Sequence, residues 1–201
     1  MNNLNISNRY MPKQVTDPKI LILSAPSGGG KTSLALALAK GRTDAHIVVS
    51  HTTREARPGE IDGVHYQFVD YDTFRRLIHQ NSFIEHASVY GNLYGTSHVA
   101  VNELLKSGKH AILDIDWQGA RAVRECYPQA ISVFILPPSI HELEQRLRER
   151  NQDSELVIRQ RMDKAMEELS HQDEFQVMLV NEHFEESVTK LNEILDSADN
   201  E

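Results

Sequence analysis

One glycine-rich stretch, residues 24–33, constrains the fold of this chain more than any other feature of its sequence. An apolar run at 20–23, typical of a buried strand, precedes it, and alternating leucine and alanine at 34–39 predict a helix directly after it. Backbone N–H groups in such a loop converge with the positive end of the helix on one point, where a phosphate group can bind. The chain is therefore predicted to bind the phosphates of a nucleoside triphosphate between a strand and a helix.

Two side chains in this loop carry the chemistry of a phosphate site. The sequence meets the pattern G-x-x-x-x-G-K-[ST] except at its first position, where Ala25 stands in place of glycine. In this pattern Lys31 reaches the β- and γ-phosphates, and the hydroxyl of Thr32 binds Mg²⁺. The competing interpretation is a glycine and serine turn before a buried helix, and the order of strand, loop and helix disfavours it.

Composition limits the class of protein. With 201 residues, 40% of them hydrophobic and 25% charged, the chain has the size and balance of one α/β domain with additions. We expect a polar tail at 1–18 and no membrane span, and the single cysteine, Cys126, favours a reducing cytoplasm. The net charge of −8 lies in residues 170–201, whereas the other 20 basic and 20 acidic side chains balance, so a nucleic-acid surface is not expected.

Apolar runs alternate with helical patterns along most of the chain. Strands are predicted at 20–23, 47–50, 110–114, 131–136 and 176–180, and the segments between most of them show the apolar spacing of helices. Strands that alternate with helices predict a parallel sheet with helices on both faces. We therefore expect an α/β fold of three layers, α/β/α, around a parallel sheet of five strands.

Residues 51–96 interrupt this alternation. Apolar and polar residues alternate at 64–68 as in a strand, and Asp72 is expected to cap a short helix. Two further strands, at 83–90 and 93–96, are joined by a Gly-Asn pair that suits a tight turn. We expect a small mixed β insertion here.

Residues 141–169 are nearly half charged, yet they keep an apolar helical face. This combination predicts a solvent-exposed arm of two helices around 151–153. Its arginines can pair with glutamates along the helix or stabilise a transferred phosphoryl group, and the sequence leaves both roles open. These arginines are Arg146, Arg148, Arg150, Arg159 and Arg161.

Two acidic residues follow the strand predicted at 110–114. In a parallel sheet, the loop after the first strand and the carboxyl ends of neighbouring strands face the same crevice. Asp114 is therefore expected to lie opposite Lys31 and to order Mg²⁺ or its waters. Asp116 can take part in the same site or can cap the helix that follows.

Arg54 and Arg57 lie three residues apart in a polar stretch, with Tyr66 downstream. Guanidinium groups bind phosphate oxygens in pairs, and a tyrosine hydroxyl can complete the shell. Two loop arginines on their own commonly face solvent. Together with the glycine-rich loop, they suggest a second phosphate site.

Glu85 falls inside a predicted strand of the insertion. A carboxylate buried there requires hydrogen-bond donors, and guanine offers a paired donor edge at N1–H and N2–H₂, whereas adenine has an acceptor at N1. The hydroxyls of Ser50 and Thr96 can reach other atoms of the same base. From the strand pattern alone, an outward-facing glutamate on an edge strand is the simpler interpretation.

Taken together, these residues resemble the bacterial guanylate kinases, a family of P-loop nucleoside monophosphate kinases. The resemblance spans about 19–195 and is most specific at 24–33, 50–68, 91–96 and 114–119. The sequence departs from the family pattern at Leu93, where tyrosine is common, and at Asn151, where glycine is frequent.

The resemblance implies a P-loop core at 19–50, 97–140 and 170–201, a GMP-binding insertion at 51–96 and a mobile lid at 141–169. It also implies Mg²⁺-dependent phosphoryl transfer from ATP to GMP, and to dGMP, in purine nucleotide metabolism. Neither nucleic acid nor membrane is implied as a partner, and a homo-oligomer stays open.

By motif position, the resemblance implies roles for individual residues. ATP would be bound by Ala25, Pro26, Ser27, Gly28, Gly29, Gly30, Lys31, Thr32 and Ser33. GMP would be bound by Ser50, Arg54, Arg57, Glu60, Tyr66, Glu85, Tyr94, Thr96, Asp114 and Asp116. Catalysis would fall to Lys31, Arg54, Arg146, Arg150 and Arg161. Thr32 would bind Mg²⁺ directly, and Asp114 would do so through water.

Two rival functions fit parts of the pattern. One is a phosphotransferase of similar core that acts on another nucleotide or on a sugar phosphate, against which Glu85, Ser50 and Thr96 argue. The other is a guanylate-kinase-like interaction domain that binds protein partners without catalysis. Such domains tend to lose the phosphate loop, whereas Lys31 and Thr32 are intact here.

Overall fold

A parallel sheet of five strands forms the centre of the computed structural model, which describes residues 17–89, 91–149 and 155–197. The strand order is β2-β7-β1-β8-β9, and each strand runs parallel to its neighbours. The strands are β1 (Ile20–Ser24), β2 (Ala45–Ile47), β7 (His110–Asp114), β8 (Ile131–Leu136) and β9 (Val177–Val180). The predicted five-stranded parallel sheet is confirmed.

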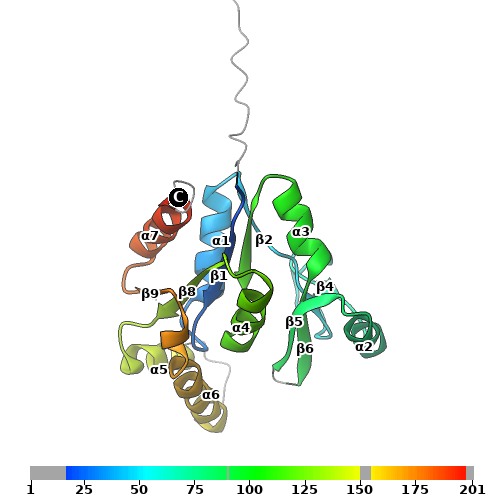
Figure 1. Ribbon diagram of the computed structural model, residues 1–201. Helices are drawn as coiled ribbons and strands as arrows, with labels where there is room; N and C mark the ends of the chain where they lie inside the picture. The colour runs from blue at the N-terminus through cyan, green and yellow to red at the C-terminus, as the bar shows by residue number, and fades with distance from the viewer. Residues whose placement is uncertain (1–16, 90, 150–154, 198–201) are drawn as a thin grey trace, which may run out of the picture.

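Helices cover both faces of this sheet (Figure 1). Apolar side chains of α1 (Lys31–Gly41) and α7 (Phe184–Ser197) pack on one face, and those of α3 (His98–Lys106) and α4 (Trp117–Cys126) pack on the other. The β1 strand is buried along its whole length because both of its faces are covered. An unbroken apolar run is what such a strand requires, so the three layers follow from the sequence pattern.

Residues between β2 and α3 form a second, mixed sheet with the order β4-β3-β6-β5. Its strands are β3 (His51–Thr52), β4 (Gln67–Phe68), β5 (Phe83–Val89) and β6 (Asn92–Ser97), and α2 (Tyr71–His79) precedes β5. The β5–β6 hairpin is antiparallel, while β3 pairs with β4 in parallel. The predicted mixed β character of this insertion is therefore confirmed.

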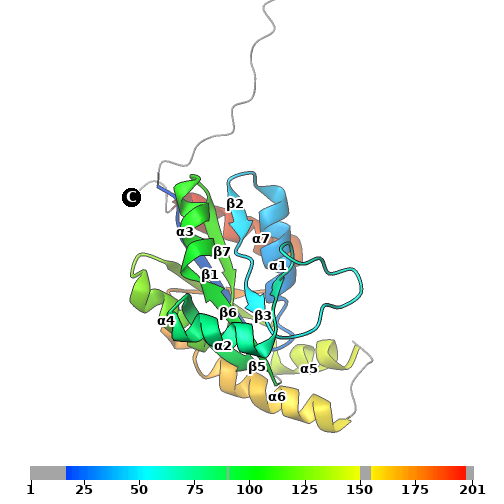
Figure 2. The same cartoon turned by 90° about the vertical axis from the view of Figure 1, so that its right-hand side faces the viewer.

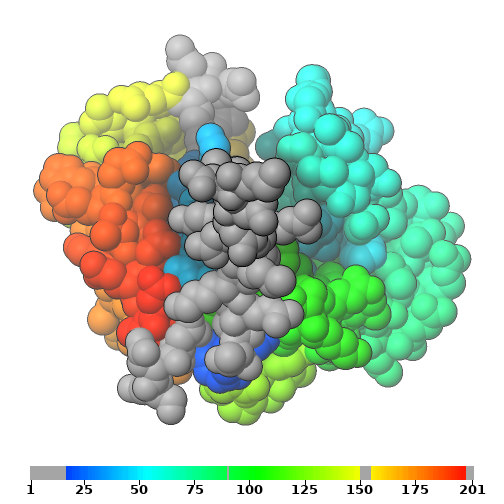
Figure 3. Space-filling model, turned by 90° about the horizontal axis from the view of Figure 1, so that it is seen from above, coloured from blue at the N-terminus to red at the C-terminus, as the bar shows by residue number. Residues whose placement is uncertain are grey.

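Two helices follow β8 and lie side by side. They are α5 (Ile140–Glu149) and α6 (Glu155–Leu169), and a short 3₁₀ turn, η1 (Gln172–Glu174), connects α6 to β9. Figure 1 shows this helical pair and the insertion on opposite sides of the core, and Figure 3 shows the same separation for α5. In Figure 2, which is viewed from the side of the insertion, α5 and α6 lie next to each other below it. That the chain is divided into a tail, a core, a GMP-binding insertion and a mobile lid stays a prediction.

Two local predictions about strands were wrong. The strand expected at 47–50 ends at Ile47, and the chain then crosses to the second sheet at His51. The strand expected at 64–68 is reduced to Gln67 and Phe68, because residues 62–66 form turns around Gly63 instead. Among the helices that the structure describes, none is both long and apolar enough to cross a membrane.

The cap of α2 was also predicted two residues too late. Asp70, not Asp72, is the N-cap residue, and its carboxylate accepts a hydrogen bond of 2.6 Å from the backbone N–H of Thr73. Asp72 lies in the first turn of the helix. Two aspartates this close to a helix start give the same sequence signal, so only geometry separates them.

We expect Asp70→Ala to lower the midpoint of thermal unfolding by roughly 2–4 °C, because an N-terminal donor of α2 loses its partner. Asp72→Ala is the matched control and should shift the midpoint by less than half as much. Circular dichroism on both variants makes the comparison. A larger loss from Asp72→Ala would contradict the assigned cap.

Candidate active site

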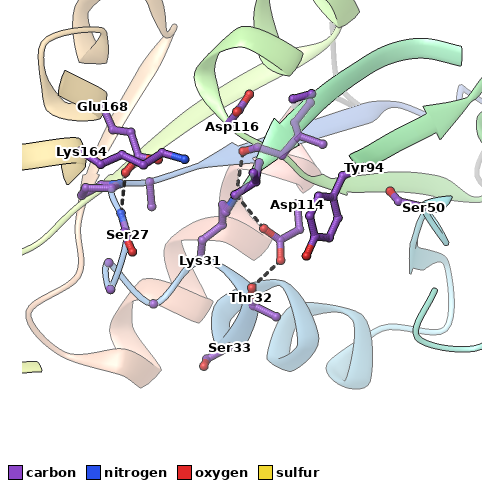
Figure 4. A pocket seen from close by; sticks show the side chains of 18 of the residues that line it. Ser27, Lys31, Thr32, Ser33, Ser50, Tyr94, Asp114, Asp116, Lys164 and Glu168 are labelled. Carbon is purple, nitrogen blue, oxygen red and sulfur yellow. Dashed lines mark hydrogen bonds and ion pairs between the residues drawn. The ribbon is translucent and has the colours of Figure 1, made fainter. Parts of the chain in front are cut away.

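A cavity of about 330 Å³ lies where the core, the insertion and the helical pair meet (Figure 4). The glycine-rich loop supplies its floor, the insertion supplies one end, and α6 supplies the other. The lining residues are 25–33 from the loop, 114–116 from β7 and its extension, Ser50, Tyr66, Glu85, Ala87, Val89 and Tyr94 from or beside the insertion, and Lys164 and Glu168 from α6.

The glycine-rich loop depends on glycine at two positions. Gly28 and Gly30 both have φ of +90°, a conformation that other residues rarely adopt. A side chain at Gly30 would also lie 2.8 Å from the amide nitrogen of Asn181, which donates a hydrogen bond to the carbonyl of Gly29. The loop is thus held from the carboxyl end of β9, a support that the sequence pattern did not reveal.

Asp114 contacts the side chains of both Lys31 and Thr32, so it lies opposite Lys31 as predicted. Its Oδ1 lies 2.9 Å from Nζ of Lys31, and its Oδ2 accepts a hydrogen bond of 2.6 Å from the hydroxyl of Thr32. Nζ of Lys31 also donates to the carbonyl of Ile115. A hydroxyl and a carboxylate side by side are the oxygen ligands that Mg²⁺ prefers in phosphate sites, so these two residues fit that ion.

Asp116 caps the helix that follows it, which is one of the two roles that the sequence left open. It is the N-cap of α4 and accepts a hydrogen bond of 2.9 Å from the backbone N–H of Gly119. Its carboxylate still borders the cavity. A capping role and a place beside a ligand are therefore compatible.

Glu85 is buried, contrary to the simpler interpretation of an outward-facing edge residue. Its strand, β5, is at the edge of the second sheet, but α4 packs against it and leaves Glu85 only 8% exposed. A side chain at Gly119 would lie 2.9 Å from Oε2 of Glu85, so any residue larger than glycine there would displace this carboxylate. Burial raises the pKa of Glu85 to about 7, although Thr96 beside it has the opposite effect.

The hydroxyls of Ser50 and Thr96 lie 3.2 Å apart beside this carboxylate. Ser50 lines the cavity, whereas Thr96 is fully buried on β6 directly opposite Glu85. The three side chains come from separate parts of the chain and form one polar cluster. This is the arrangement that the sequence suggested for a base-binding site.

Arg54 is held in place beside the cavity. Its guanidinium makes two hydrogen bonds, of 2.8 and 2.9 Å, with the carboxylate of Glu60, and it lies over the ring of Tyr66. These contacts, first that with Arg54 and then that with the backbone N–H of Arg57, lower the pKa of Glu60 to about 2. Tyr66 and Tyr94 line the cavity, whereas Arg54, Arg57 and Glu60 are not among its lining residues, and Arg57 is exposed.

The helical pair reaches the cavity through residues that the sequence reasoning missed. Glu168 and Lys164, one turn apart on α6, both line it. Of the predicted lid arginines, Arg146 and Arg161 lie outside the lining, and Arg150 lies outside the described residues. Arg146 instead pairs with Glu142 and donates to the carbonyl of Asn181. The helical spacing of 158–169 predicted a buried face but could not show that a carboxylate occupies it.

Comparison with known proteins identifies the family. The family model described as guanylate kinase matches residues 17–198. The chain belongs to the guanylate kinase family. It is 50% identical over 178 residues to the guanylate kinase of Escherichia coli strain K12, covering 88% of this chain and 86% of that protein. It is 49% identical over 181 residues to the guanylate kinase of Methylococcus capsulatus, covering 90% and 89%.

Two solved structures agree with the fold. The crystal structure of guanylate kinase from Anaplasma phagocytophilum matches with a TM-score of 0.76 and 34% identity, over 94% of this chain and 89% of that chain. The SH3-kinase fragment of tight junction protein 3 matches with a TM-score of 0.54 and 12% identity, over 94% of this chain and 61% of that one. The second match shows a shared fold alone.

The burial of Glu85 leads to a prediction about the stability of this guanylate kinase family member. Folding raises the pKa of Glu85 from 4.5 to about 7, so the folded protein binds the proton more tightly than the unfolded chain does. The carboxyl therefore destabilises the fold progressively as the pH rises through this range. We expect Glu85→Gln to increase the free energy of unfolding by about 1–3 kcal/mol near pH 8 and to change it little near pH 5.

Urea unfolding at both pH values, with Glu55→Gln as an exposed control, measures this difference. If Glu85→Gln destabilised the protein at pH 8, or if its effect were the same at both pH values, ionisation of the buried Glu85 would not destabilise the fold as we expect.

Proposed function

We propose that this protein transfers the γ-phosphoryl group of ATP to the phosphate of GMP through the cavity described above, giving ADP and GDP. Membership of the guanylate kinase family supports this reaction class, because guanylate kinases are ATP:GMP phosphotransferases. One observation carries the proposal for this chain: the buried carboxylate of Glu85 lines the same cavity as Lys31 of the phosphate loop. One cavity can thus hold a base and a phosphate donor together.

The guanine of GMP is proposed to bind at the polar cluster of Glu85, Ser50 and Thr96. The N1–H and N2–H₂ groups would donate to the Glu85 carboxylate and supply the partners that its burial demands. Adenine would leave the carboxylate facing the lone pair of N1. The hydroxyls of Ser50 and Thr96, together with Asp116, would contact the remaining polar atoms of the base.

The phosphate of GMP is proposed to bind between the insertion and the loop. Arg54 and Arg57 would bind its oxygens, and the hydroxyls of Tyr66 and Tyr94 would complete the shell. Glu60 is proposed to act by fixing the guanidinium of Arg54, with which it already makes two hydrogen bonds. A guanidinium whose orientation is fixed in advance loses less entropy when it binds an anion.

The phosphates of ATP are proposed to bind along residues 25–33, with Lys31 at the β- and γ-phosphates. The lid arginines Arg146, Arg150 and Arg161 would stabilise the charge of the transferred group after the lid closes. A contact supports this link between lid and loop. Leu143 and Leu147 of α5 approach Gly28 so closely that a side chain there would lie 3.0 Å from Leu147.

Thr32 and Asp114 are proposed to hold Mg²⁺, directly and through water respectively. The hydroxyl and the carboxylate are already 2.6 Å apart, which suits a shared ion. When bound, Mg²⁺ supplies positive charge to the β- and γ-phosphates. Asp114 would then exchange its present contact with Lys31 for that ion, and the ammonium of Lys31 would turn to the phosphates.

Catalysis in this arrangement needs no protein base, because the attacking phosphate of GMP is mostly dianionic near pH 7. The side chains position the two phosphates in line and neutralise their charge. Closure of the insertion over GMP and of the lid over ATP would exclude water, which limits hydrolysis of ATP.

We infer a cytoplasmic enzyme of purine nucleotide metabolism that also accepts dGMP, because the proposed contacts to the base do not involve the 2′-hydroxyl. The lone cysteine is consistent with a reducing compartment. Neither nucleic acid nor membrane is proposed as a partner, and self-association stays open.

A panel of acceptors tests the proposal. With Mg-ATP as donor, ADP release should be fastest with GMP, followed by dGMP, and at least about a hundredfold slower in kcat/KM with AMP, UMP or TMP. Lys31→Met serves as the inactive control, and its circular dichroism should match that of the unaltered protein. A preference for AMP would overturn the proposed acceptor. Absence of turnover with GMP in folded protein would favour a non-catalytic interaction domain.

A further inference from the structure

Glu168 occupies a position on α6 where the helical pattern calls for an apolar residue. With Ile158 and Ala165 it belongs to the buried face of the helix, and only 7% of it is exposed. Its carboxylate does not point to solvent. Oε2 accepts a hydrogen bond of 2.7 Å from the backbone N–H of Ser27, inside the glycine-rich loop (Figure 4).

Burying this carboxylate costs free energy, and the packing of α6 against the core does not require a carboxylate. Burial raises the pKa of Glu168, while the hydrogen bond from Ser27 and the nearby charge of Lys164 have the opposite effect. Replacing a buried charged group by an apolar residue of similar volume is often neutral or stabilising. A carboxylate at this place therefore points to a role beyond holding α6 to the core.

The partner of Glu168 lies at a sensitive point of the loop. Ser27 immediately precedes Gly28, whose φ of +90° is a left-handed conformation that residues other than glycine rarely adopt. On the other side of the loop, the amide of Asn181 donates to the carbonyl of Gly29 at 3.3 Å. The loop is thus held from two sides, by β9 through Asn181 and by α6 through Glu168.

We propose that Glu168 is a positioning residue for the phosphate-donor half of the site, which fixes the conformation of loop 25–33 through the backbone N–H of Ser27 and joins the lid helix α6 to that loop. This inference rests on the proposed function, in which the loop binds ATP. It assigns Glu168 no contact with GMP, because Glu168 and Ser50 of the polar cluster lie at opposite ends of the cavity (Figure 4).

Substitutions of Glu168 can separate its hydrogen bond with Ser27 from its negative charge. Glutamine keeps an oxygen that accepts from Ser27 but removes the charge, whereas leucine fills the space and accepts nothing. A purely structural Glu168 predicts that leucine is tolerated or stabilising. A positioning Glu168 predicts that leucine impairs ATP binding in a protein that is still folded.

The test compares Glu168→Leu, Glu168→Gln and the neighbouring exposed control Glu167→Leu. We expect Glu168→Leu to raise the KM for ATP and the Kd for ADP about tenfold or more, and to leave the KM for GMP within about twofold. Glu168→Gln should recover most of the ATP affinity, and Glu167→Leu should behave like the unaltered protein. If Glu168→Leu melts below the assay temperature, Glu168→Ala measured in the cold takes its place.

Three results would overturn the proposal: an unchanged affinity for ATP and ADP in folded Glu168→Leu, equal losses for ATP and GMP, or a Glu168→Gln variant as poor as Glu168→Leu. Calorimetric binding of ADP needs no turnover, so it tests Glu168 separately from the reaction. If the unaltered protein bound ADP but did not phosphorylate GMP, the proposed reaction would fail while the role of Glu168 would still be measured.

Discussion

Parallel pairing of β1 with β7 brings the end of each strand to the same edge of the sheet, and the cavity is built around that edge. Leu23 pairs in register with Asp114, so the loop that follows β1 lies against the Asp114 carboxylate. The ammonium of Lys31 and the hydroxyl of Thr32 are paired with that carboxylate rather than left without partners. A nucleotide that binds there must exchange these contacts for its own, which favours phosphates that arrive with a cation.

The two ends of the cavity are set by carboxylates from elements added to the core. Glu85 comes from the insertion and Glu168 from α6, and burial raises the pKa of both. In each case a negatively charged group is kept out of water beside the cavity, at a cost to stability. In our account, guanine compensates this cost at Glu85, and the N–H of Ser27 does so at Glu168. Because these two residues lie at opposite ends, Glu85 is assigned to the binding of GMP and Glu168 to the binding of ATP.

Much of this structure could be predicted from the sequence because the core signals are local. The strands at 110–114 and 131–136 are mostly apolar and largely buried, and the loop is recognised by its spacing. The insertion was harder, since β3 and β4 have two residues each and exist through pairing with distant segments. The burial of Glu85 depends on the packing of α4, and the contact of Glu168 spans 141 residues. The pattern of the surrounding segment identifies neither of these partners.

The central claim is that a buried carboxylate in the phosphate-loop cavity selects the acceptor nucleotide. Calorimetric titration of Glu85→Gln near pH 8, with GMP and ADP in separate experiments, tests this claim most directly. The account predicts that the Kd for GMP rises roughly thirtyfold or more while the Kd for ADP stays within about twofold. Equal weakening of both nucleotides, or an unchanged Kd for GMP, would contradict it.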